Sequence, residues 1–68
     1  MSLELTVETE LALLKGNKSA LMTRYANEQQ VIINKYGENR SDVPADPHNS
    51  DVKEFNRIQL KLNLLGKM

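Results

Sequence analysis

Apolar positions along residues 3–36 follow the period of a single α-helix. When successive residues are placed about 100° apart, ten apolar residues of this segment fall within an arc of roughly 120°. They are Leu3, Val7, Leu11, Leu14, Leu21, Met22, Tyr25, Ile32, Ile33 and Tyr36. This apolar stripe stays in phase across Gly16-Asn17, and Gly16 itself points toward solvent. The pattern therefore predicts one long helix over residues 3–36, with Ser2 or Thr6 as its N-cap.

Residues 37–50 have the composition of a loop, and a second amphipathic segment follows them. The loop contains Gly37, Pro44 and Pro47 among Asn, Ser and Asp residues, and each proline disfavours helix in the residue before it. Beyond the loop, an apolar 3-4-3 spacing predicts a helix over residues 51–66; it is formed by Phe55, Ile58, Leu62 and Leu65. Asp46-Pro47 and an Asp51–Glu54 capping box are both acceptable starts for this helix. The predicted fold is all-α: one helix-loop-helix domain over residues 1–68, with a long first helix and a shorter second helix folded back.

The two predicted helices differ in length, and this leaves apolar surface uncovered. At 1.5 Å per residue the first helix is about 50 Å long and the second about 24 Å. The second helix then covers only residues 20–36, and two of its leucines lie on the side away from Ile58. A large exposed apolar patch is unusual on a monomer. We therefore predict self-association into a helical bundle, as a coiled-coil homodimer or higher oligomer, through Leu3, Val7, Leu11, Leu14, Leu60 and Leu64.

A second interpretation stays open for the first segment. If the helix breaks at Gly16-Asn17, the chain becomes a compact three-helix monomer in which these leucines meet. Glycine in a helix interior costs about 1 kcal/mol relative to alanine. The apolar stripe alone does not decide between the two arrangements.

The balance of charge argues against a general polyanion binder. Nine Lys and Arg residues equal nine Asp and Glu residues, so no net positive field attracts nucleic acid. Basic residues nevertheless meet near the middle of an antiparallel hairpin. An alternative function is therefore a small nucleic-acid-binding regulator with anion contacts at Lys15, Lys18, Arg24, Arg57 and Lys61.

Residues that could support catalysis or metal binding are few. The chain has no cysteine, which excludes disulfides and thiolate sites. His48 is the single histidine, and its neighbours Asp46 and Asp51 are ordinary turn and cap residues. We therefore expect no catalytic residue, no metal, no cofactor and no small-molecule substrate. The longest apolar run, Leu11–Leu14, is too short to cross a bilayer, and we expect a cytoplasmic protein.

The turn Pro44-Ala45-Asp46-Pro47 resembles the Pro-x-Asp-Pro turn of type III secretion needle and rod subunits, which are small helical hairpins that polymerise. The likeness covers these four residues only, and the short second helix departs from that family's long C-terminal helix. Membership is therefore not inferred. The sequence favours a non-catalytic protein–protein interaction module: a small adaptor, an assembly subunit or a chaperone-like subunit.

Overall fold

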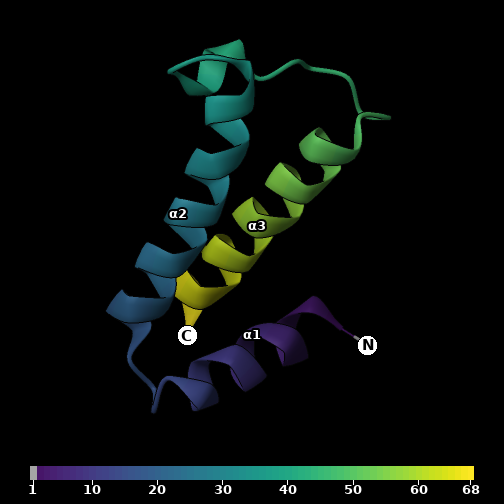
Figure 1. Cartoon of the computed structure of the whole chain (residues 1–68). Coiled ribbons are helices and arrows are strands. Elements are labelled where there is room, and N and C mark those ends of the chain that lie inside the picture. The colour runs from purple at the N-terminus through teal and green to yellow at the C-terminus, as the bar shows by residue number, and fades with distance from the viewer. Residues whose placement is uncertain (1) are drawn as a thin grey trace.

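A computed structural model describes residues 2–68, and this range contains three α-helices and no strand. Helix α2 (Lys18–Tyr36) and helix α3 (Ser50–Lys67) run antiparallel as a hairpin, and helix α1 (Leu3–Leu13) lies across one end of it (Figure 1). A short 3-10 turn, η1 (Arg40–Asp42), stands in the connection between α2 and α3. The all-α class is confirmed, whereas the single helix over residues 3–36 is wrong.

The predicted long helix ends after Leu13 because the chain forms a Schellman-type turn there. The Gly16 N–H donates to the Leu11 carbonyl (2.9 Å) and the Lys15 N–H donates to the Ala12 carbonyl (3.0 Å). This turn places two residues in the left-handed region, Lys15 at φ 57° and Gly16 at φ 78°. Glycine tolerates that region, but a side chain such as that of Lys15 makes it costly by roughly 1–2 kcal/mol.

A new helix begins directly after this turn. The Asn17 side chain accepts a hydrogen bond from the Ala20 N–H (3.1 Å), which is the geometry of an N-cap. The interruption from Leu14 to Asn17 spans about one helical turn. For that reason the apolar positions on its two sides keep the same phase although the helix is broken.

The hydrophobic core lies between α2 and α3, and α1 covers one end of it. Within α1, Val7 is the one residue that is fully buried; Leu11 and Leu14 pack against the core from its edge. All other buried residues of the described chain belong to the hairpin: Leu21, Tyr25, Ile32, Val52, Phe55, Ile58 and Leu65. The hairpin therefore supplies most of the packing, and α1 is the smaller partner.

Side chains fasten the far end of the hairpin, where α2 ends and α3 begins. Asn49 is the N-cap of α3, accepting from the Asp51 N–H (2.8 Å) and the Val52 N–H (3.3 Å). Its amide also donates to the Tyr36 hydroxyl (3.1 Å), and that hydroxyl donates to Asp51 (2.8 Å). The hydrogen bonds from Tyr36 and Lys35 hold the pKa of Asp51 below its usual value. The cap is thus Asn49 rather than either predicted start, Asp46 or Asp51.

The exit from α2 depends on a close approach between Gly37 and Asp42. The Asp42 carboxylate accepts hydrogen bonds from the backbone N–H groups of Asn39 and Glu38, at 2.9 Å each. These bonds lower the pKa of Asp42. A Cβ atom on Gly37 would collide with this side chain. Glycine is required here by space and not by a left-handed backbone.

Candidate interaction surface

Three polar side chains, one from each helix, meet where α1 rests on the hairpin. Glu10 of α1 accepts a hydrogen bond from the buried Tyr25 hydroxyl of α2 on one carboxylate oxygen. Its other oxygen accepts from Lys61 Nζ of α3 at 3.1 Å. Lys61 Nζ also lies 5.3 Å from the centre of the Tyr25 ring, in cation–π range. We call Glu10, Tyr25 and Lys61 the clasp.

The clasp is an ion pair shielded from water. The side chains of Lys61 and Glu10 are 11% and 24% exposed. Burial alone would raise the pKa of Glu10, but the hydrogen bonds from Tyr25 and Lys61 outweigh it and the pKa is lowered. Burial and the neighbouring carboxylate raise the pKa of Tyr25. At neutral pH Glu10 is therefore a carboxylate and Tyr25 a neutral phenol, and the clasp holds α1 to both helices of the hairpin.

The predicted interaction surface is mostly covered by the chain's own hairpin. Val7 is fully buried, Leu11, Leu14 and Leu64 are partly buried against the core, and Leu3 is half-buried. The expectation that the stripe from Leu3 to Leu14 lacks an intrachain partner is wrong, because the turn after Leu13 brings α1 back onto the hairpin. Among these six residues Leu60 is exposed, at 54%. Their role in binding a partner stays a prediction.

Helix α1 carries a second apolar face that the single-stripe interpretation missed. Leu5 is 49% exposed and Leu13 is 74% exposed, and Ala12 is exposed as well. At about 100° per residue these side chains are centred roughly 180° from Val7. We call Leu5, Ala12 and Leu13 the outer face of α1. The signal was present in the sequence as the i, i+8 pair of leucines outside the predicted stripe.

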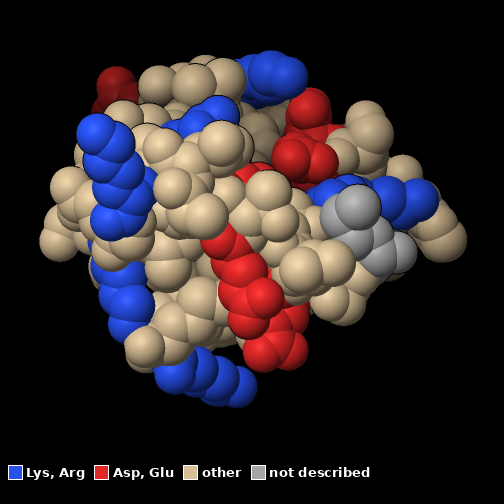
Figure 2. Space-filling view, turned by 90° about the horizontal axis from the view of Figure 1, so that it is seen from below, with Lys and Arg blue, Asp and Glu red and all other residues tan. Residues whose placement is uncertain are grey.

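The structure places the five predicted anion contacts in different surroundings, and their role in binding an anion stays a prediction. Lys15, Lys18 and Arg57 are exposed, whereas Lys61 is held in the clasp. Arg24 pairs with Glu28, with Nε and Oε1 3.8 Å apart. Figure 2 shows the end of the molecule at which α1 lies: basic side chains stand around the edge of this view and acidic side chains cross its middle. The mixed signs oppose a continuous contact with a phosphate backbone.

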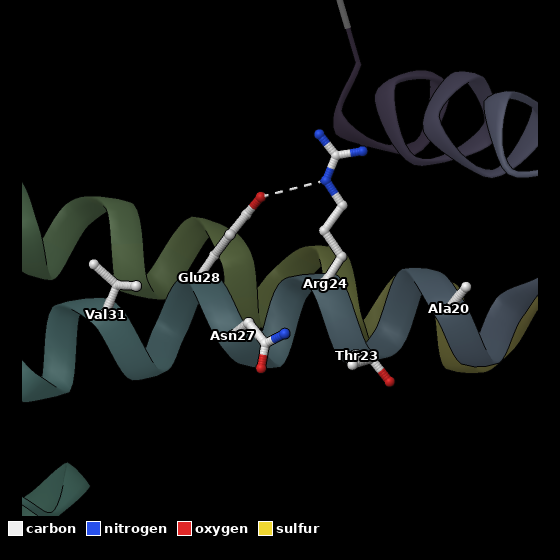
Figure 3. A pocket seen from close by; sticks show the side chains of 6 residues that line it. All are labelled: Ala20, Thr23, Arg24, Asn27, Glu28 and Val31. Carbon is white, nitrogen blue, oxygen red and sulfur yellow. Dashed lines mark ion pairs between the residues drawn. The ribbon is translucent and has the colours of Figure 1, made fainter.

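A shallow depression runs along the solvent side of α2. Its lining residues come from this one helix (Figure 3): Ala20, Thr23, Arg24, Asn27, Glu28 and Val31. The Arg24–Glu28 ion pair lies along it, and the hollow is open to solvent. A surface hollow of this kind does not enclose a substrate.

The loop residues considered for chemistry make a turn. The His48 N–H donates to the Asp46 side chain (2.9 Å), an Asx-turn hydrogen bond. Residues 2–68 contain no group of three or more His, Cys, Asp and Glu side chains that could hold a metal ion. Among the described helices, none has the length and apolarity needed to span a bilayer.

No family model, curated protein or solved structure matches the chain.

Proposed function

We propose that the chain is a non-catalytic protein–protein interaction module that associates with itself or with another protein. The observation that carries this proposal is the outer face of α1, which presents Leu5, Ala12 and Leu13 to solvent on the side opposite the buried Val7. A helix that is apolar on two opposite faces is typical of a helix packed between two neighbours. The hairpin supplies one neighbour, and a binding partner would supply the other.

The charge of α1 favours a basic partner for its outer face. Glu4 and Glu8 are exposed on α1, and this helix contains no Lys or Arg. Two α1 helices facing each other would bring like charges together, which opposes association. A helix from another protein, with an apolar stripe bordered by Lys or Arg, would complement both the apolar outer face and the acidic charge of α1.

The test compares the wild-type chain with Leu5→Glu, Leu13→Glu and the double variant. Covering the exposed part of the two leucines is worth about 2–3 kcal/mol together, so we expect the double variant to weaken binding by roughly 30- to 150-fold. Val31→Glu is the matched control, because Val31 is 61% exposed but lies on α2. Binding is measured by quantitative capture from the native host and then by calorimetry with the captured protein.

Two results would contradict the proposal. In one, every protein bound by the wild-type chain is bound equally by the Leu5→Glu/Leu13→Glu variant. In the other, Val31→Glu weakens binding as much as the double variant does. Circular dichroism of each variant establishes that the three helices are retained, so that a loss of binding reports on the surface.

A further inference from the structure

The contacts between α1 and the hairpin form a docking site for a single helix. Val7 is buried in it, Leu11 and Leu14 line its edge, and the clasp fixes the position of Glu10. None of these contacts depends on which chain supplies α1. The chain therefore carries both a helix-binding site and the helix that fits it.

The connection between α1 and the hairpin has the properties of a hinge. It is short, running from Leu14 to Asn17, and it contains a non-glycine residue, Lys15, in the left-handed region. Short hinges under strain favour exchange of an element between identical chains. The apolar stripe is in phase on both sides of this hinge, so residues 14–17 can also continue as helix and carry α1 away from its own hairpin.

We propose that α1 exchanges between two copies of the chain, giving a swapped dimer in which Glu10 of each copy occupies the clasp of the other. The exchange rests on the self-association named in the proposed function, and it uses the clasp as the contact and a second copy of the chain as the partner. The outer face of α1 is not used, because Leu5 and Leu13 stay exposed whichever hairpin binds α1. In the monomer α1 docks at an effective concentration of about millimolar, so the wild-type dimer forms as the protein concentration approaches that range.

Charge reversal in the clasp separates exchange from other modes of association. Glu10→Lys places two cations together, and Lys61→Glu places two anions together, so each variant alone loses its clasp. In a mixture, a swapped heterodimer restores both sites. At one site the lysine introduced by Glu10→Lys meets the glutamate introduced by Lys61→Glu, and at the other the native Glu10 and Lys61 meet. We expect the mixture to form a 1:1 complex at least tenfold more tightly than either variant self-associates, as measured by native mass spectrometry and light scattering.

The control mixture carries the same charge changes at exposed positions outside the clasp, Glu38→Lys and Lys53→Glu, and gains no heterodimer. A clasp mixture that stays at the 7.7 kDa of single chains at every concentration overturns the proposal. So does a heterodimer that forms equally in the control mixture.

A second variant keeps the clasp intact and changes only the hinge. The triple substitution Lys15→Ala, Gly16→Ala and Asn17→Ala removes the left-handed turn and the N-cap and favours helix through residues 14–17. We expect at least a tenfold increase in dimer affinity relative to the wild type; an unchanged monomer overturns the proposal.

The outcomes for the two proposals are distinguishable. Partner binding that requires Leu5 and Leu13, together with no clasp heterodimer, rejects exchange and leaves the interaction module standing. In the opposite case, a clasp heterodimer persists in a Leu5→Glu/Leu13→Glu background while no partner depends on the outer face. That result supports exchange of α1 and rejects binding of a partner at the outer face.

Discussion

Replacing Lys61 by methionine tests how strongly the clasp holds the three helices together. Methionine keeps most of the length of the side chain but removes the ammonium group that donates to Glu10 at 3.1 Å and lies over the Tyr25 ring. A hydrogen bond to a charged group contributes about 1.5–3 kcal/mol, and the cation–π contact about 0.5–1 kcal/mol. Because both partners are largely shielded from water, we expect a loss of about 2–3 kcal/mol.

This loss is large for a chain of 68 residues. At about 0.05–0.15 kcal/mol per residue, the free energy of unfolding is about 3–10 kcal/mol. A change of about 1 kcal/mol shifts the melting temperature of so small a domain by about 4–8 °C. The Lys61→Met variant should therefore melt roughly 10–20 °C below the wild type, as measured by circular dichroism and by urea denaturation at neutral pH. Lys53→Met, at an exposed position of the same helix, is the control and should change little.

The difference between wild type and Lys61→Met should also depend on pH with a defined sign. The folded-state pKa of Glu10 lies below its ordinary value of 4.5. The ion pair therefore contributes fully above that ordinary value, and its contribution is lost as the pH falls through the folded-state pKa. The two proteins should therefore converge in stability as the pH falls through the folded-state pKa of Glu10. A Lys61→Met loss within about 0.5 kcal/mol of the Lys53→Met loss, or a difference independent of pH, would refute the reasoning.

Two further changes test the turns. Gly37→Ala should lower the free energy of unfolding, because the added methyl displaces Asp42 from the backbone N–H groups it caps. In the control, Gly66→Ala, the added methyl meets no atom within 4 Å, and the change should stabilise α3 by up to about 0.5–1 kcal/mol. Urea denaturation measures both variants. Equal effects would contradict the close approach of Gly37 and Asp42. Asn17→Ala should cost about 1 kcal/mol through loss of the α2 N-cap, seen in the melting temperature; an unchanged value would place the cap elsewhere.

The helix break was the main feature of the fold that the apolar pattern failed to predict. Phase continuity is a poor test for an interruption of about one turn, because four residues rotate a helix by about 400°, only about 40° more than a full turn. Asn17 directly before the apolar positions of α2 was the usable signal, since Asn is a favoured N-cap. Lys15 gave no signal, because a lysine in the left-handed region is rare. By contrast, the loop prolines and the apolar spacing of the last segment placed α3 within about one residue at each end.

The clasp could not be predicted from local spacing. Glu10 and Tyr25 are 15 residues apart, and Glu10 and Lys61 are 51 residues apart, so only the fold brings them together. Lys61 instead looked like a free cation on a helix face. The outer face of α1 was within reach of the sequence, but a search for one stripe per helix discards apolar residues on the opposite side.

The hydrogen bonds among Tyr36, Asn49 and Asp51 have a practical consequence for the segment that connects α2 to α3. Because these side chains tie the helix ends directly, the connecting segment need not be short, and doubling the length of a flexible loop costs only about 0.6 kcal/mol. Ala45 is exposed in this segment, which lies at the opposite end of the hairpin from α1 (Figure 1). An epitope or fluorescent reporter inserted at Ala45 would therefore leave the contacts between α1 and the hairpin undisturbed.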